Sequence, residues 1–284
     1  MTSGEYRSGF CAFVGRPNAG KSTLTNALVG SKIVITSDKP QTTRRAVRGV
    51  LSRPDGQLVI VDTPGLHRPR TLLGQRLNDV VRASLTQVDV IGLCVPADEK
   101  IGPGDRFIAA ELQQLNTPLI AIVTKTDKVG KVRIAEQLMA VSQLCDFAEV
   151  VPLSAVAGDQ VALLADLLIA KMPAGPQLYP DDVHSDESTE TRISELIREA
   201  ALADVRDELP HSIAVTVTEM NPRDGRDDLL DIFATLHLER SSQRPIILGP
   251  GGRHLRDIGI EARRGIEAEV RSTLEAVATG TARG

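Results

Sequence analysis

The chain has 284 residues, of which 42% are hydrophobic and 25% are charged, and its formal net charge is -4. These proportions are typical of a soluble globular protein, and the length favours two domains. The charge is uneven: residues 1–172 carry 20 Lys and Arg against 16 Asp and Glu, whereas residues 173–284 carry 13 against 21, which argues against simple electrostatic capture of nucleic acid by the second half.

The cysteines and the chain ends predict a cytoplasmic protein. Cys11, Cys94 and Cys145 form no close pair, so neither a disulfide framework nor a thiolate metal site is indicated, and a reducing compartment fits. The first residues, MTSGEYRSGF, contain no apolar signal core. No segment approaches the roughly 18 apolar residues of a membrane span, and the final TARG offers no cysteine for a lipid anchor.

Apolar runs alternate with helix-length segments through the first 172 residues. This alternation predicts an α/β domain with a mostly parallel sheet and crossover helices on both faces. The predicted strands are FCAFV (10–14), QLVIV (57–61), VDVIGLCVP (88–96), PLIAIVT (118–124) and EVVPLS (149–154). The first domain is therefore expected to span residues 1–172.

A stretch rich in proline, glycine and acidic residues, 173–190, predicts a surface linker. After it we expect a second, α+β domain over residues 191–284. Its predicted elements are a helix from about Thr189 to Glu208, a strand at 211–220, a polar loop at 221–228, a second strand at 229–240 and a late helix at 260–277.

The segment GRPNAGKS follows the first apolar run and precedes an amphipathic helix, which is the setting of a phosphate-binding loop. Glycines let backbone amides approach the phosphates, and a helix N-terminus favours an anion. Lys21 is expected to reach the β- and γ-phosphates, and Ser22 to ligate Mg²⁺. The predicted nucleotide contacts here are Gly15, Arg16, Pro17, Asn18, Ala19, Gly20, Lys21, Ser22 and Thr23.

The segment DTPG, residues 62–65, follows the second apolar run. A carboxylate at a strand end can hold the metal through water, so Asp62 is a predicted metal residue, and the amide of Gly65 is expected to meet the γ-phosphate. Thr63 and Pro64 complete this nucleotide-binding motif. Leu66 follows at the position where a water-orienting glutamine is expected, and since leucine forms no hydrogen bond with water, slow basal hydrolysis is predicted.

Two further segments at strand ends predict a guanine site. In TKTD, Asp127 can accept bonds from both N1–H and the 2-amino group of guanine, which adenine does not offer. In SAVAG, the amide of Ala155 can donate to guanine O6. A site with such polar groups rejects the wrong base strongly, because those groups would be left unpaired. Thr124, Lys125 and Ser154 complete the predicted contacts.

The ordered motifs GRPNAGKS, QTTR, DTPGLH, TKTD and SAVAG, followed by ILGPGGRHLRDIG, resemble the Era family of ribosome-assembly GTPases over nearly the whole chain. The resemblance implies a Ras-like P-loop GTPase domain and a C-terminal KH domain that binds 16S ribosomal RNA and the 30S small subunit. It implies that Thr43 closes on Mg²⁺ and the γ-phosphate, giving the catalytic set Lys21, Thr43 and Gly65.

The resemblance implies two further properties that rest on the family. Asn18 occupies a position that helps hold K⁺ near the phosphates in related GTPases, so K⁺ joins Mg²⁺ and GTP among the expected cofactors. Peripheral association with the inner membrane is the other expectation, and it rests on the family alone.

The chain departs from the family pattern in three places. Thr124 stands where the base-recognition motif usually starts with asparagine, and GPGG replaces a loop that often carries lysine. After the late helix, the family's last strand and basic tail do not follow, so the KH domain is expected to be incomplete.

Six arginines between residues 240 and 264 still indicate a basic patch. The predicted RNA-binding residues are Gly249, Pro250, Gly251, Gly252, Arg253, His254 and Arg256.

Two alternative functions remain open from the sequence. Leu66, Thr124 and the missing strand favour a weakly hydrolysing, nucleotide-responsive RNA-binding adaptor. A tRNA-modification GTPase is the other alternative, although the cysteine-bearing C-terminal tail expected of that class is absent.

Overall fold

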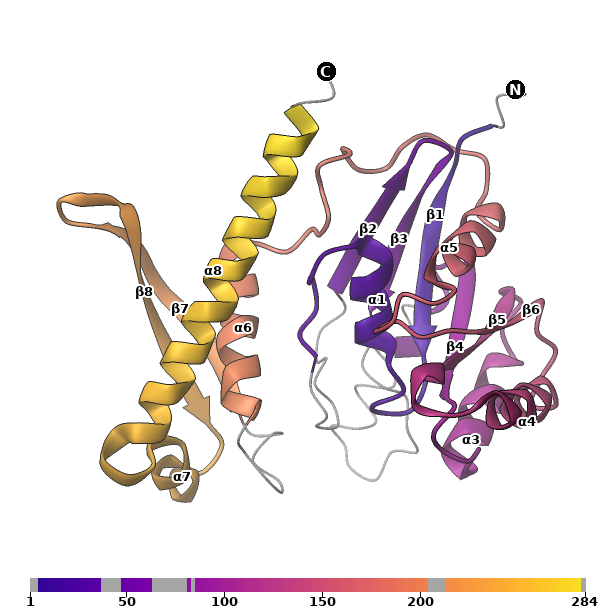
Figure 1. The fold of residues 1–284 in the computed structure, drawn as a ribbon, viewed down its shortest axis with the longest axis horizontal. Helices are drawn as coiled ribbons and strands as arrows, with labels where there is room; N and C mark the ends of the chain where they lie inside the picture. Colours follow the sequence, from indigo (N-terminus) through magenta and orange to yellow (C-terminus); the bar gives the residue numbers. More distant parts are fainter. Residues whose placement is uncertain (1–4, 37–46, 63–80, 83–84, 204–212, 282–284) are drawn as a thin grey trace. The chain divides into compact units, whose positions relative to one another are not determined.

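The structure is a computed structural model that describes residues 5–36, 47–62, 81–82, 85–203 and 213–281. The chain divides into two compact units, Met1–Asp186 and Glu187–Gly284. Figure 1 traces an α/β fold in the first unit and an α+β fold in the second, which confirms the predicted fold class.

The first unit is built on a six-stranded sheet with the order β2-β3-β1-β4-β5-β6. Among the described strands of this sheet, β2 runs antiparallel to its neighbour β3, and the other pairs are parallel. The strands are β1 Arg7–Val14, β2 Val47–Arg53, β3 Gly56–Asp62, β4 Val90–Pro96, β5 Leu119–Thr124 and β6 Glu149–Pro152. All five predicted strands are therefore confirmed, and β2 is an addition that the apolar runs did not predict.

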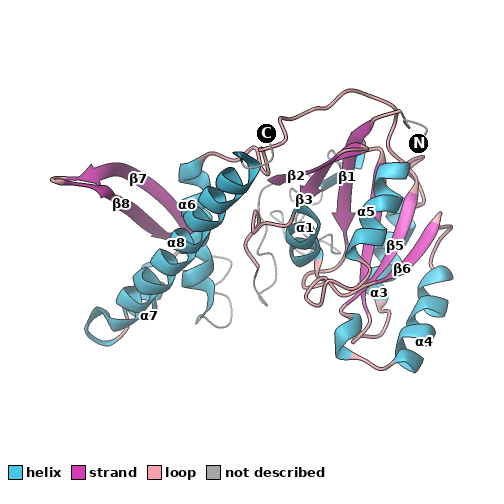
Figure 2. Cartoon of the chain, turned by 45° about the horizontal axis from the view of Figure 1, so that its top comes forward, coloured by secondary structure: helices cyan, strands magenta, loops and turns pink. Residues whose placement is uncertain are grey.

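Helices cover both faces of this sheet, as expected for strands that are apolar on both sides (Figure 2). On one face, Cys11 and Phe13 of β1 share a core with α1 (Lys21–Val29) and α5 (Val161–Ala170). On the other, Ala12 and Val14 share a core with α3 (Pro103–Leu112) and α4 (Lys131–Ser142). Successive residues of β1 point to opposite faces, and this alternation builds two cores from one strand.

Residues 173–186, here called the strap, lie along strands of the first unit. Pro173 accepts a bond from the backbone of Ser8, and His184 accepts one from Val50 on β2, at N···O distances of 3.1 and 2.9 Å. Between them, the buried side chain of Gln57 accepts hydrogen bonds from the backbone N–H groups of residues 178 and 179. These bonds give the proline-rich segment a fixed path over the first unit.

The second unit places two helices against a hairpin. Ile193 and Leu196 of α6 are buried, as are Ile213 at the start of β7 and Ile258 on α8. Residues 204–212 lie outside the described residues, so the predicted end of the first helix, Glu208, is not located. The elements are α6 Thr189–Ala203, β7 Ile213–Arg223, β8 Arg226–Leu238, η3 Ser241–Gln243, α7 Arg244–Leu248, η4 Pro250–Gly252 and α8 Arg253–Thr281.

The predicted polar loop at 221–228 is wrong. The antiparallel strands β7 and β8 continue through it, and only Asp224 and Gly225 connect Arg223 with Arg226. Gly225 adopts a φ of 72°, which glycine tolerates in a tight connection. Arg223 on β7 donates hydrogen bonds from Nε and Nη2 to the carboxylate of Asp231 on β8. Polar side chains therefore stabilise the exposed tip of the hairpin.

No helix within the described parts of the chain combines the length and the apolar character needed to cross a membrane.

Candidate functional site

The phosphate-binding loop connects β1 to α1, as predicted. Gly15 adopts a φ of 156° and Gly20 one of 89°, and α1 begins immediately after Gly20. A Cβ atom on Gly15 would lie 2.5 Å from the backbone oxygen of Cys94 on β4, so only glycine lets the loop pack this closely on the sheet. The loop therefore brings the N-terminus of α1 to the carboxyl edge of the parallel strands, where ligands bind in open α/β sheets.

Lys21 lies inside this loop. Its side chain is buried, and its Nζ donates hydrogen bonds to the backbone oxygens of Gly15 and Arg16 at 3.2 and 3.0 Å. Burial lowers the pKa of Lys21 from its ordinary value, and the negative charge of Asp62 only partly opposes this effect. A phosphate group beside Lys21 would compensate the cost of burying its charge.

Ser22 and Asp62 lie side by side, although 40 residues separate them in the sequence. The Ser22 hydroxyl donates a 3.1 Å hydrogen bond to Oδ2 of Asp62, whose side chain is fully buried at the end of β3. This pair supplies two oxygen atoms of the kind that Mg²⁺ prefers. No cluster of three or more His, Cys, Asp or Glu suited to a metal occurs in the described residues.

Four predicted site residues fall in segments outside the description. They are Thr43, Thr63, Pro64 and Gly65. Leu66 lies in the same region.

The base-recognition motif follows β5 and is tied to the phosphate-binding loop. The Thr124 hydroxyl donates a buried 2.7 Å hydrogen bond to the backbone oxygen of Ala19. Lys125 adopts a left-handed φ of 57°, after which η1 (Thr126–Lys128) turns Asp127 outward, where its side chain is exposed. Threonine at the first motif position therefore keeps a direct bond between the two loops.

Ser154 orients the carboxylate of Asp127. The Ser154 hydroxyl donates a 2.6 Å hydrogen bond to Oδ1 of Asp127 and accepts one from the backbone N–H of Ala157 at 3.1 Å. Ala155 is half-buried beside it. The structure thus brings the two predicted guanine motifs together, and it gives Ser154 a defined role in holding Asp127.

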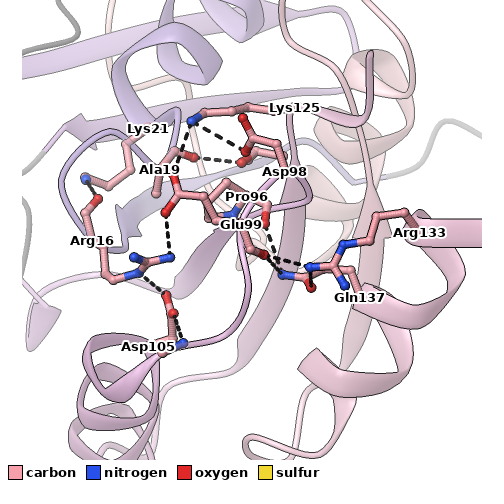
Figure 3. A network of polar contacts seen from close by, with 12 residues as sticks. Arg16, Ala19, Lys21, Pro96, Asp98, Glu99, Asp105, Lys125, Arg133 and Gln137 are labelled. Carbon is pink, nitrogen blue, oxygen red and sulfur yellow. Dashed lines mark hydrogen bonds and ion pairs between the residues drawn. The ribbon is translucent and has the colours of Figure 1, made fainter. Parts of the chain in front are cut away.

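Acidic residues between the end of β4 and the first turn of α3, which were not predicted as site residues, lie beside both nucleotide-binding motifs (Figure 3). Arg16 donates to the buried Asp105 at 2.7 Å and pairs with Glu99 at 3.1 Å, while Lys125 lies 3.7 Å from Asp98. Burial by itself would lower the pKa of Arg16, but its bond to Asp105 and the nearby negative charges raise it overall. The sequence signal that could have predicted these residues is ADEKIGPGD (97–105), an acidic segment that directly follows an apolar strand at the ligand-binding edge of the sheet.

In the second unit, GPGG lies between α7 and α8. Gly249, Gly251 and Gly252 all have positive φ angles, and a Cβ on Gly249 would lie 2.7 Å from the Cβ of His254. The ring of His254 bonds through Nδ1 to the backbone oxygen of Ile246 at 2.9 Å, and because a carbonyl only accepts, Nδ1 carries the proton. His254 therefore packs against α7, whereas Arg253 and Arg256 are exposed beside the loop.

Family models match both units. Residues 10–125 match a model described as a 50S ribosome-binding GTPase, and residues 208–278 match a KH domain. The chain is 61% identical to the GTPase Era of Nocardioides sp. over 272 residues, covering 93% of this chain and 87% of the relative. It belongs to the Era family of GTPases. The GTPase Era of Mycobacterium avium is 60% identical over 266 residues, covering 93% of this chain and 89% of that protein.

Two solved Era structures resemble this chain across both units. One is Era in complex with MgGDPNP and nucleotides 1506–1542 of 16S ribosomal RNA, and the other is a single-residue variant of Aquifex aeolicus Era bound to GDP.AlF4-. Each has a TM-score of 0.88 and 34% identity and covers 93% of this chain; the alignments cover 89% and 90% of the solved chains, respectively. The sequence-based assignment to the Era family is therefore confirmed.

Proposed function

We propose that this chain is a GTP-binding and GTP-hydrolysing switch that binds 16S ribosomal RNA and the 30S subunit during ribosome assembly. The observation that carries the proposal is the bond between Thr124 and Ala19. It joins a phosphate-binding loop to a guanine-recognition motif at one edge of the sheet, in a chain of the Era family. A nucleotide spanning both loops would meet phosphate-binding groups at one end and Asp127 at the other.

On the phosphate side, N–H donors and the Lys21 ammonium group bind the phosphates, whereas side-chain oxygen atoms hold Mg²⁺. Lys21 and the amides of the loop from Gly15 to Gly20, with Thr23 in the first turn of α1, bind the phosphate oxygens. Ser22 and Asp62, supported by their 3.1 Å contact, would hold Mg²⁺ together with Thr43. When bound, Mg²⁺ neutralises charge that develops on the phosphates during transfer.

On the base side, Asp127 accepts from the two guanine donors, and Ser154 fixes the direction of its carboxylate. The amide of Ala155 donates to guanine O6. Lys125, in the same motif as Asp127, forms ion pairs with Asp98 and Glu99. Adenine would leave these groups unpaired, so discrimination against ATP follows.

Hydrolysis requires an oriented water molecule. We assign the catalytic role to Lys21, Thr43 and Gly65, with the water positioned by backbone groups, a bound partner or a cation because Leu66 has no polar group. Asn18 has a φ of 62°, and this left-handed conformation supports a specific role for its position in the loop. K⁺ held near Asn18 is the proposed cation.

The second unit is the proposed RNA-binding module. The solved Era that carries RNA was determined with a segment of 16S ribosomal RNA, which supports the same target here. Arg253 and Arg256 would contact phosphates, while the three glycines of GPGG allow close backbone approach. We propose a GTPase domain at 1–172, a linker at 173–190 and a KH-like RNA-binding domain at 191–284, acting in the cytoplasm with peripheral inner-membrane association.

Co-sedimentation with purified small ribosomal subunits tests the partner and the switch together. We expect binding with a non-hydrolysable GTP analogue to differ from binding with GDP. The Asp127→Asn variant supplies the control, since it should lose the response to guanine nucleotides and regain it with xanthine nucleotides. Equal sedimentation of the wild-type protein in all nucleotide states would contradict the switch.

Turnover with and without small subunits separates the switch from the adaptor alternative. The bond from Thr124 to Ala19 weakens one argument for the adaptor, because the base-recognition motif remains tied to the phosphate-binding loop. Hydrolysis that stays negligible with subunits present would favour the adaptor. Membership of the Era family removes the support for a tRNA-modification GTPase.

A further inference from the structure

The carboxylate of Glu99 lies between the phosphate-binding loop and the base-recognition motif (Figure 3). Its Oε2 is 3.1 Å from an Arg16 guanidinium nitrogen, and its Oε1 is 3.8 Å from Nζ of Lys125. We propose that Glu99 is a positioning residue that sets the separation of these two loops and thereby slows the release of guanine nucleotides. The inference rests on the proposed GTP site.

The backbone of Glu99 is anchored independently of its side chain. The Glu99 carbonyl accepts hydrogen bonds from Arg133 and from Gln137 of α4, each at 3.1 Å. Gln137 is buried and also donates to the carbonyl of Pro96 at 3.0 Å. Helix α4 therefore fixes the point from which the Glu99 carboxylate reaches the two loops.

The neighbouring carboxylates each contact one side of the site. Asp105 is fully buried, bonds to Arg16 and also accepts from the N–H of Gly102, where α3 begins. Within the described parts of the chain, the ion pairs of Asp98 are with the base-recognition side, at 3.7 Å from Lys125 and 3.6 Å from Lys128. Among the ion pairs of the described residues, Glu99 is the acidic residue that pairs with both loops.

The single hydroxyl of Thr124 explains why the ion pairs of Glu99 matter for the position of the two loops. Asparagine carries two N–H donors, whereas the threonine hydroxyl carries one, and here that donor is used on Ala19. A single bond constrains a distance but leaves rotation between the loops. The two ion pairs of Glu99 add further points of attachment and restrict that rotation.

A nucleotide bound to both loops is released when either contact set opens, so loosening their relative position speeds dissociation. The ion pairs of Glu99 are partly exposed, and such pairs are individually weak. We expect Glu99→Gln, which keeps the shape but removes the charge, to speed GDP release by about two- to tenfold.

The test measures dissociation of a fluorescent GDP analogue from the full chain in Mg²⁺ buffer. Three glutamine or asparagine substitutions are compared: Glu99→Gln, Asp98→Asn and Glu111→Gln. Glu111 of α3 pairs with Arg82, which belongs to neither loop, so its variant should match the wild type. Asp98→Asn removes a charge from Lys125 without touching the Arg16 side and should have a smaller effect than Glu99→Gln.

Salt dependence distinguishes positioning by charge from a general loss of stability. At about 0.5 M salt, where the Debye length is only about 4 Å, the difference between the wild type and Glu99→Gln should shrink. The thermal unfolding midpoint of each variant checks that it is folded, and Asp98→Asn and Glu99→Gln should unfold alike.

The inference and the proposed function fail in different ways. If the wild-type chain does not bind the GDP analogue, the proposed function is wrong. If it binds, but Glu99→Gln releases nucleotide at the rate of Glu111→Gln, Glu99 does not position the loops. Equal acceleration by Asp98→Asn and Glu99→Gln, or acceleration that does not change with salt, would also overturn the proposal.

Discussion

The hydroxyl of Thr124 and the backbone oxygen of Ala19 form a buried 2.7 Å hydrogen bond across 105 residues of sequence. It connects the end of β5 to the phosphate-binding loop. The base-recognition motif is therefore tied directly to the phosphate-binding loop, and the first prediction follows from breaking this bond.

Replacing Thr124 with valine removes the hydroxyl and keeps the side-chain shape. The buried Ala19 oxygen would lose its partner, so the free energy of unfolding should fall by about 1–2 kcal/mol, and GDP should bind more weakly. Denaturant titration and nucleotide titration measure the two effects. Thr124→Ser retains the hydroxyl and serves as the control; wild-type values in the valine variant would show that this bond contributes nothing.

Asp127→Asn should move the preference from guanine to xanthine nucleotides, because the new amide can donate to the 2-oxo group of xanthine. Ser154→Ala should weaken GTP binding by about fivefold without this switch, since the Asp127 carboxylate loses one hydrogen bond that orients it. Competition assays with GTP, XTP and ATP compare the variants. Wild-type protein that bound ATP as tightly as GTP would disprove the base assignment.

Exchanging K⁺ for Na⁺ should slow GTP turnover, since the proposed site near Asn18 would hold the larger cation close to the phosphates. Asn18→Ala should lower the rate in K⁺ and abolish the difference between the two ions. Single-turnover assays at equal ionic strength provide the comparison. Equal wild-type rates in K⁺ and Na⁺ would remove the cation from the mechanism.

Gln57→Ala should loosen the strap from the first unit. The fully buried Gln57 side chain bonds to backbone groups of Leu178 and Tyr179, and losing these three hydrogen bonds should lower the free energy of unfolding by about 2 kcal/mol. Proteolysis within residues 173–186 should also become faster. Gln177→Ala is the matched control, because Gln177 bonds only within the strap and is exposed.

Reversing the charges of Arg253 and Arg256 together should weaken binding to single-stranded 16S ribosomal RNA. The dependence of affinity on salt should flatten by about 0.7 log unit for each lost phosphate contact, while GTP binding is retained. Arg264→Glu changes the charge of the same helix away from GPGG and should have a smaller effect. RNA binding that stays unchanged across a salt series would leave GPGG without a role in recognition.

The local motifs and the alternation of strands and helices were determined by the sequence alone. A phosphate-binding loop needs glycines that adopt positive φ angles directly before a helix, and the eight residues GRPNAGKS meet this requirement. The apolar runs predicted five strands because strands buried on both faces are continuously hydrophobic. The order of the motifs then identified the family.

The remaining features required the tertiary structure, because their partners are distant or their pattern is polar. Strand β2, VRGVLSR, mixes charged and apolar residues and becomes a strand by pairing antiparallel with β3. The hairpin tip looked like a loop, although its Asp-Gly pair is a turn signal between two strands. Glu99 gains a role only because folding brings it between Arg16 and Lys125, and no local rule of sequence encodes a contact over such separations.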